Sequence, residues 1–113
     1  MRVSFDLDGT AWRYRPIFAA LAKALQAAGH EVGVITAHDP ALFTEDKRLW
    51  KARGFPEPHF FYNLGDIRDA GIEWLEPRTS KLAFARLKQI DVHIDDFDSS
   101  AIELVVLMPE AGA

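Results

Sequence analysis

Apolar runs alternate with amphipathic segments along the chain, in an order that predicts β-α-β-α-β connectivity. Short runs rich in Val, Ile, Phe and Leu predict strands at 2–6, 31–36, 59–64, 92–95 and 104–108. Apolar spacings of three and four residues predict helices at 16–29, 39–54 and 79–90. The segment 65–77 has no clear period, so we expect a connector there, anchored by Trp74 and able to act as a partial lid.

This alternation predicts one α/β domain over residues 1–113, a Rossmann-like three-layer sandwich with a five-stranded parallel sheet. The length of 113 residues suits a single core, and the sequence contains neither an internal repeat nor a low-complexity linker. Sheets of this kind bind ligands at the carboxyl ends of their strands. We therefore expect the chemistry of the protein at that edge.

Polar side chains follow three of the predicted strands at their carboxyl ends: Asp6 and Asp8, then Thr36, then Asp95 and Asp96. Lys81 is expected in the first turn of the helix before the fourth strand, and its long side chain can reach the same edge. Acids from two strands in one cleft repel each other unless a cation neutralises them. Carboxylate oxygens in a chain without Cys favour Mg²⁺.

The composition of 49% hydrophobic and 27% charged residues, with a net charge of −4, is typical of a packed globular protein. Basic residues are scattered, so bulk charge indicates neither a nucleic-acid nor a membrane surface. The absence of Cys excludes disulfides, thiolate zinc sites and a cysteine nucleophile. Asp6 follows only five residues and no apolar run has membrane-spanning length, so we expect a cytoplasmic protein that binds no membrane.

Four motifs in order resemble those of haloacid-dehalogenase (HAD) superfamily phosphohydrolases. The first is "DLDGT", the second is "VGVIT" ending at Thr36, the third is Lys81 and the fourth is "VHIDD". The resemblance runs from about residue 2 to about residue 97. It implies that Asp6 is the nucleophile that takes a phosphoryl group, and that Asp8 protonates the leaving group and then activates water.

The resemblance also implies how phosphate and metal are bound. Thr36 and Lys81 would hold the phosphate oxygens. Mg²⁺ would be bound by the Asp6 carboxylate, the Asp8 backbone carbonyl, and either Asp95 or Asp96. In this family phosphatases have Asp at the position of Asp8 whereas true dehalogenases do not, which argues against carbon–halogen chemistry.

We therefore expect a Mg²⁺-dependent phosphomonoesterase that acts through an aspartyl-phosphate on Asp6. One alternative is a nucleotide or polynucleotide-end phosphatase of phage or bacterial type. Another, of a different class, is a non-catalytic phosphate- or partner-binding module with the same fold. Lys88 competes with Lys81 for the third motif, and "GDIRD" (65–69) competes with Asp95 and Asp96, although it precedes Lys81 and so breaks the order of the motifs.

The protein is expected to have no cap domain, because only "AWRYR" (11–15) separates Thr10 from the first helix and 44 residues separate Thr36 from Lys81. An open cleft suits a substrate that covers itself, such as a nucleotide, a nucleic-acid end or a phosphoprotein, or an oligomer that covers the site. In an extended hairpin, Trp12 and Tyr14 would share one face and Arg13 and Arg15 the other. We expect Trp12, Arg13 and Tyr14, together with His38, to select the substrate, unless these aromatic side chains simply cover the core.

Overall fold

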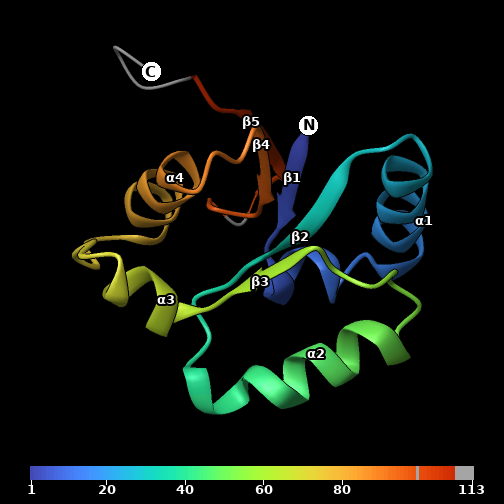
Figure 1. Cartoon of the computed structure of the whole chain (residues 1–113), viewed down its shortest axis with the longest axis horizontal. Coiled ribbons are helices and arrows are strands. Elements are labelled where there is room, and N and C mark those ends of the chain that lie inside the picture. Colours follow the sequence, from blue (N-terminus) through green and yellow to red (C-terminus); the bar gives the residue numbers. More distant parts are fainter. Residues whose placement is uncertain (99, 109–113) are drawn as a thin grey trace.

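The computed structural model describes residues 1–98 and 100–108. Its main elements are β1 (Arg2–Phe5), α1 (Arg15–Ala27), β2 (Glu31–Ile35), α2 (Phe43–Ala52), β3 (Phe60–Tyr62), α3 (Leu64–Asp69), α4 (Pro77–Leu87), β4 (Val92–Asp95) and β5 (Glu103–Val106) (Figure 1). A turn, η1 (Leu7–Ala11), whose backbone is non-helical at Asp8 and Gly9, follows β1, and a 3₁₀ turn, η2 (Pro40–Leu42), precedes α2.

The five strands form one sheet in the order β3-β2-β1-β4-β5. The first four are parallel, but β5 runs antiparallel to β4, with Glu103 opposite Asp95. The expectation of a fully parallel sheet is therefore wrong at its last strand. A parallel pair needs a crossover of about a dozen residues or more, and the link 96–102 is too short for one.

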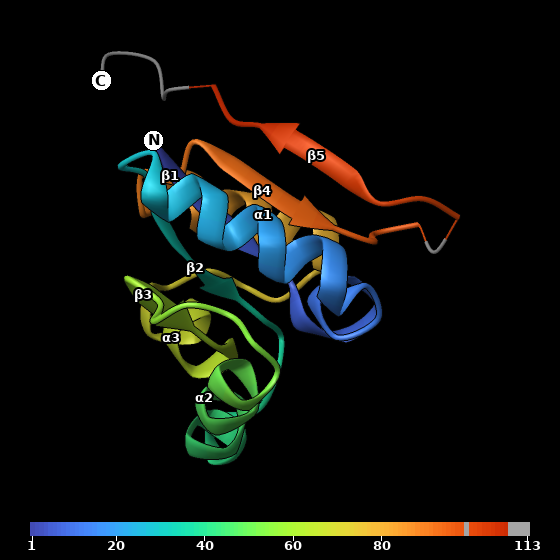
Figure 2. The same ribbon diagram turned by 90° about the vertical axis from the view of Figure 1, so that its right-hand side faces the viewer.

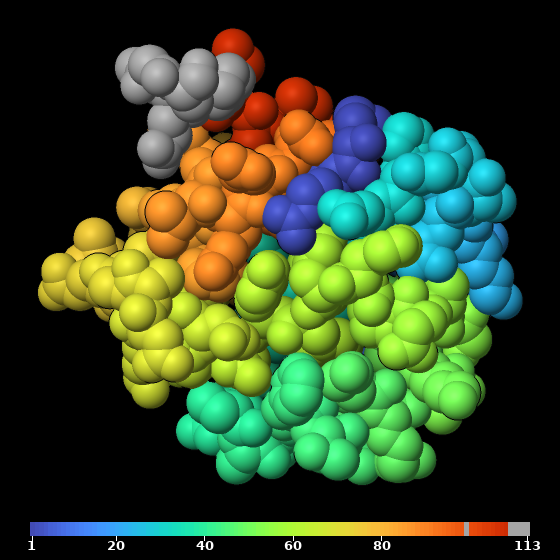
Figure 3. All heavy atoms as spheres, in the orientation of Figure 1, coloured from blue at the N-terminus to red at the C-terminus, as the bar shows by residue number. Residues whose placement is uncertain are grey.

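Helices cover both faces of the sheet (Figures 1 and 2). Side chains alternate along each strand, so Val3 and Phe5 pack in the core cluster that includes residues of α1 and α2. Ile35 and Phe60 pack in a second cluster, with residues of α3 and α4. In the space-filling view, the yellow-green segment around β3 reaches the surface beside the green α2 (Figure 3). The strand β3 is thus one edge of the sheet and β5 is the other.

Two helices differ from the sequence-based expectation. The short helix α3 overlaps the start of the segment 65–77 and begins with a capping box between Asn63 and Asp66. The helix α4 begins at Pro77, because proline suits the first helical turn, so Lys81 lies in the second turn rather than the first. No helix within residues 1–98 and 100–108 is both long and apolar enough to cross a membrane.

The strand order brings the carboxyl ends of β1 and β4 side by side. β1 lies between β2 and β4, so the chain builds the sheet outward on one side of β1 and then crosses to the other side. Ligands of open α/β sheets bind at this point of reversal, outside the carboxyl ends of the strands. Here the carboxyl ends of β1 and β4 are followed by the two pairs of acids, Asp6 and Asp8, and Asp95 and Asp96.

Candidate active site

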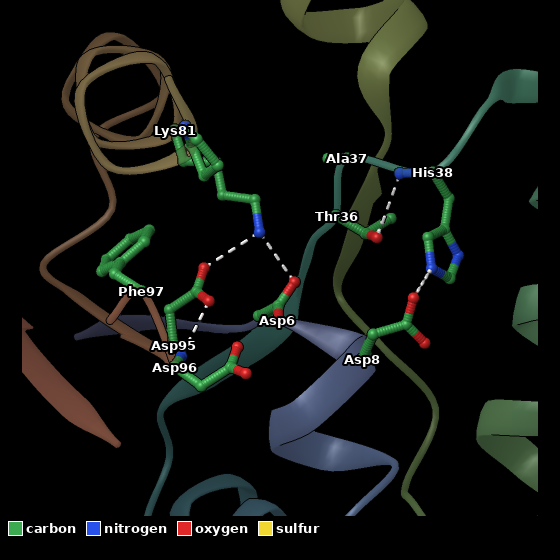
Figure 4. Close-up of a pocket in the computed structure, with 10 residues that line it drawn as sticks. Asp6, Asp8, Thr36, Ala37, His38, Lys81, Asp95, Asp96 and Phe97 are labelled. Carbon is green, nitrogen blue, oxygen red and sulfur yellow. Dashed lines mark hydrogen bonds and ion pairs between the residues drawn. The ribbon is translucent and has the colours of Figure 1, made fainter. Parts of the chain in front are cut away.

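A cavity of about 290 Å³ opens at the carboxyl ends of β1, β2 and β4 (Figure 4). Its walls combine the turn after β1, the segment after β2, the helix α4 and the end of β4. The lining residues are Asp6, Asp8, Thr36, Ala37, His38, Pro77, Lys81, Asp95, Asp96 and Phe97. The residues with expected roles in phosphate transfer or metal binding, from four parts of the chain, therefore line one cavity.

Lys81 joins the two acidic strand ends. Its ammonium donates hydrogen bonds to Asp6 Oδ1 at 2.7 Å and to Asp95 Oδ2 at 2.9 Å (Figure 4). All three side chains are buried. A buried charge is costly unless it is paired, and the single positive charge of Lys81 neutralises one of the two carboxylate charges.

Asp95 has a second buried partner. His93 Nε2 lies 2.9 Å from Asp95 Oδ2, and His93 Nδ1 lies 2.6 Å from the Ser4 hydroxyl. Burial lowers the pKa of His93 despite the nearby Asp95, so the imidazole is neutral. The neutral ring donates from Nε2 to Asp95 and accepts the Ser4 hydroxyl proton at Nδ1. Ser4 and His93 fix the position of Asp95 from inside the sheet.

The two carboxyl groups beside Lys81 differ in acidity. Burial raises the pKa of Asp6 to about 7, against the opposing charge of Lys81, and the charge of Asp95 adds to this rise. Burial also opposes ionisation of Asp95, but the His93 hydrogen bond and the Lys81 charge outweigh it and lower the pKa of Asp95 to about 2. The same acids raise the pKa of Lys81 although burial opposes its charge. Without metal, the Asp6 carboxyl is therefore partly protonated near neutral pH.

Three carboxylates are close enough to bind one cation. Oxygens of Asp6, Asp95 and Asp96 lie within 4.8 Å of one another. Asp96 packs against Gly9, and the Thr10 hydroxyl donates to it at 3.4 Å. This oxygen-only donor set suits Mg²⁺. The Asp8 carboxylate is outside the set, because it turns toward His38 on the other side of the cavity (Figure 4).

Thr36 lies across the cavity from Lys81 (Figure 4). Its backbone N–H donates to the Tyr62 carbonyl at 3.0 Å, which continues the β2–β3 pairing by one residue. Its hydroxyl oxygen accepts the backbone N–H of His38 at 3.2 Å. Because that oxygen is the acceptor in this bond, its hydroxyl proton is available to a phosphate oxygen.

His38 lies between two acids. Its Nε2 is 2.6 Å from Asp8 Oδ2 and its Nδ1 is 2.8 Å from Asp46 Oδ2. Partial burial opposes the charged ring, but hydrogen bonds to Asp8 and Asp46 outweigh it and raise the pKa of His38. Asp46 was not a sequence-based candidate, because an acid in a helix with exposed charged neighbours gives no sign of burial.

The segment 11–15 is not an extended hairpin. η1 covers residues 7–11, residues 12 and 13 form a turn, and α1 starts at Arg15. Trp12 packs against Trp50 and Phe55 in the first core cluster, and it is not among the residues that line the cavity.

Arg13 and Tyr14 line a second cavity, of about 200 Å³, which shares Asp96 with the first. Gly9, Ser100, Ala101 and Ile102 complete its walls. The second cavity therefore lies beside the acidic end of β4.

The alternative motif residues lie elsewhere. The Lys88 ammonium stacks over the rings of Tyr62 and Phe84 and is absent from the cavity lining. In "GDIRD", Asp66 accepts the Asn63 backbone N–H in the α3 capping box. Trp74 packs on the second core cluster.

Comparison of the chain with protein families, with curated proteins and with solved structures gives no match. The candidate site therefore rests on the residues and geometry of this chain.

Proposed function

We propose that the protein is a Mg²⁺-dependent phosphomonoesterase of HAD type, built on a Rossmann-like fold without a cap domain. The observation that carries the proposal is that Lys81 contacts Asp6 and Asp95, with the Asp96 carboxylate close to both acids, at the point where the sheet order reverses. Phosphoryl transfer to a carboxylate needs this combination, because nucleophile and substrate are both negatively charged.

Asp6 is the proposed nucleophile. One of its oxygens attacks phosphorus, a P–O bond to Asp6 forms, and the P–O bond to the leaving group breaks. The leaving oxygen takes a proton from Asp8. Water then attacks the aspartyl-phosphate, Asp8 accepts its proton, and inorganic phosphate leaves with the Asp6 carboxylate restored.

Lys81 and Thr36 are the proposed phosphate ligands. Lys81 supplies a buried positive charge next to Asp6, and Thr36 supplies a hydroxyl donor from the opposite wall of the cavity. Both donors are held before substrate arrives, Lys81 by its ion pairs and Thr36 by its backbone hydrogen bonds. Donors fixed in this way stabilise developing charge without reorganisation.

Asp6, Asp95 and Asp96 are the residues that would hold Mg²⁺, with the Asp8 carbonyl implied by the family pattern as a further ligand. The bound ion would supply positive charge to the phosphoryl oxygens. Of the two adjacent acids, Asp96 is the less buried, and Asp95 already accepts hydrogen bonds from Lys81 and His93.

A nucleotide or a nucleic-acid end is the proposed substrate class, and a phosphoprotein is the alternative. The second cavity favours the former, because Arg13 can pair with a further phosphate and Tyr14 can stack on a base beside the reacting centre. Tyr14 is exposed, so its ring is accessible to a ligand.

The test is phosphate release from nucleotides, 3′- and 5′-phosphorylated oligonucleotides, phosphopeptides and p-nitrophenyl phosphate, with Mg²⁺ and with EDTA. The Asp6→Asn variant should lose several orders of magnitude in rate, as for other nucleophile removals. Asp69→Asn, which makes the same change at an exposed position on α3, should retain full activity. Full activity in EDTA or in Asp6→Asn would exclude the mechanism. Phosphate binding without turnover would favour the non-catalytic module.

A further inference from the structure

His38 is held at three points, which leave its Nε2 facing Asp8. Its backbone N–H donates to the Thr36 hydroxyl at 3.2 Å, and its carbonyl accepts the Leu64 N–H at 3.0 Å. Its ring nitrogen Nδ1 is 2.8 Å from Asp46 Oδ2. The position of the residue and the orientation of its ring are therefore both set before any substrate binds.

Asp46 is the third of these anchors and is itself unusual. It lies on α2 one helical turn before Trp50, on the inward side, and its side chain is 7% exposed. An ionised carboxylate at such a position destabilises a fold unless it is hydrogen-bonded. Within residues 1–98 and 100–108, His38 is the hydrogen-bond partner of this carboxylate. The hydrogen bond that compensates for the burial of Asp46 therefore also fixes the orientation of the His38 ring.

Asp8, unlike Asp46, has an exposed side chain. Its side chain is 74% exposed, and His38 Nε2, at 2.6 Å, is the contact that gives it a direction. An exposed aspartate otherwise samples several rotamers. The buried Asp46 therefore fixes the ring of His38, and this ring in turn fixes the direction of the exposed Asp8 carboxyl.

We propose that His38 and Asp46 are positioning residues that set the direction of the Asp8 carboxyl for proton transfer to the leaving group. The inference rests on the phosphatase function proposed above. His38 acts through Asp8, and Asp46 acts through His38. The ion pairs of Lys81 with Asp6 and Asp95 involve neither of them.

Loss of this positioning should slow the reaction of some substrates more than that of others. Proton transfer matters most when the leaving oxygen is strongly basic, as in an alkyl phosphate, and least for p-nitrophenolate, which leaves without a proton. Loss of the positioning pair should therefore slow phosphoryl transfer from an alkyl phosphate and leave transfer from p-nitrophenyl phosphate little changed. The Michaelis constants should change little, because the phosphate ligands are retained.

Two amide substitutions of His38, each of which replaces one ring nitrogen, separate positioning from simple structural support. In His38→Gln the amide nitrogen replaces Nε2 and can still donate to Asp8. In His38→Asn the amide nitrogen replaces Nδ1, so it faces Asp46 and does not reach Asp8. Asp46→Asn removes the charge that anchors the ring, and Glu45→Gln is its exposed control on the same helix.

The experiment measures the rate of the first phosphoryl transfer in single turnovers with Mg²⁺, for an alkyl phosphate and for p-nitrophenyl phosphate. We expect His38→Asn to lose about 10- to 100-fold on the alkyl phosphate, less than the roughly 10²- to 10⁴-fold of a complete loss of general acid catalysis, because Asp8 itself is retained. His38→Gln should recover much of this loss, Asp46→Asn should fall between them, and Glu45→Gln should match the unmodified protein. Circular dichroism and the Mg²⁺ affinity of each variant serve as folding controls.

Equal losses of rate on the two substrates, or a higher rate in His38→Asn than in His38→Gln, would overturn the positioning role. The contact of His38 with Asp46 would then only connect α2 to the loop after β2. If His38→Asn fails to fold, the ratio of the two rates in Asp46→Asn decides the same question. An unmodified protein that hydrolyses neither substrate would instead overturn the proposed function itself. The two failures are thus distinct.

Discussion

The carboxylate of Asp96 occupies the space that a side chain at Gly9 would fill. Gly9 also has a φ of 73°, a left-handed conformation that glycine adopts without strain. The turn after β1 therefore depends on this glycine for two reasons. It lets the backbone bend between Asp8 and Thr10, and it leaves room for a proposed metal ligand from the end of β4.

Gly9→Ala should weaken Mg²⁺ binding, because the new methyl group displaces Asp96. It should also lower the free energy of unfolding by about 1–2 kcal/mol through backbone strain. Gly29→Ala is the matched control, since Gly29 has a φ of 92° and open space around it. Calorimetric Mg²⁺ titration and urea denaturation of both variants measure the two effects. Equal Mg²⁺ affinity in the two variants would contradict the ligand role of Asp96.

Asp6→Asn should stabilise the metal-free protein, and more so at higher pH. Burial raises the pKa of Asp6 to about 7 in the fold, from 3.8 for the ordinary side chain. The folded form therefore binds more protons between these values, and its stability falls as pH rises through them. A tenfold difference in proton affinity between the folded and unfolded forms corresponds to about 1.4 kcal/mol. The gain from the substitution should be near zero at low pH and reach a plateau above about pH 8.

Urea denaturation in EDTA across this pH range measures the gain. Asp69→Asn is the control, since it makes the same change at an exposed position. A gain that is independent of pH would indicate that Asp6 is ionised throughout.

Mg²⁺ affinity should rise with pH up to about 7 and then level, because the Asp6 proton must leave before the cation binds. Calorimetry in buffers of different ionisation enthalpy gives the number of protons released. We expect about one proton per bound ion well below pH 7 and none well above it. Release of no proton at any pH would contradict either the raised pKa of Asp6 or its role as a ligand, and the pH dependence of the Asp6→Asn gain distinguishes the two.

Lys81→Met should destabilise the metal-free protein near neutral pH by about 3–5 kcal/mol, because Asp95 loses a buried cationic partner. Mg²⁺ should then raise the melting temperature of Lys81→Met more than that of the unmodified protein, since it replaces the missing charge. Lys88→Met is the comparison, because that lysine stacks over Tyr62 and Phe84 outside the cavity. An equal response to Mg²⁺ in both variants would argue against a shared site.

Arg13→Ala should raise KM for a nucleotide substrate and leave hydrolysis of p-nitrophenyl phosphate unchanged, because Arg13 lines the second cavity. Trp12→Ala should behave differently and lose up to about 3 kcal/mol of stability, because Trp12 is partly buried against the core. Steady-state kinetics and thermal denaturation separate the two. If Arg13→Ala affects both substrates alike, the second cavity does not bind the substrate.

The alternation of strands and helices was predictable from apolar spacing, and so was the α/β class. The direction of β5 was predicted wrongly, although the short link 96–102 contained the information that no crossover fits there. The helix α3 was missed for a different reason. Its start is marked by Asn63 and Asp66, three residues apart, but so short a helix has almost no apolar period.

The positions of the cavity residues that follow the strands could be predicted from the sequence, since parallel strands present their carboxyl ends at one edge of the sheet. The contacts of His38 could not, because they depend on how the loop after β2 meets α2 and the turn after β1. Trp12 illustrates the same limit. An aromatic residue beside "DLDGT" suits a substrate contact and a core contact equally, and only packing against Trp50 and Phe55 decides between them.

The central position of β1 also bears on how the protein folds. Lys81 lies 14 residues from Asp95 along the chain but 75 residues from Asp6. Closing the longer loop carries the larger entropy cost, so contacts of this separation form late. On a ribosome, β1 and β2 can pair while β4 is still unsynthesised, but the acids of β4 arrive only after the other three parallel strands. A cation held by Asp6, Asp95 and Asp96, as proposed above, would therefore stabilise the finished fold and would not assist the folding of the nascent chain.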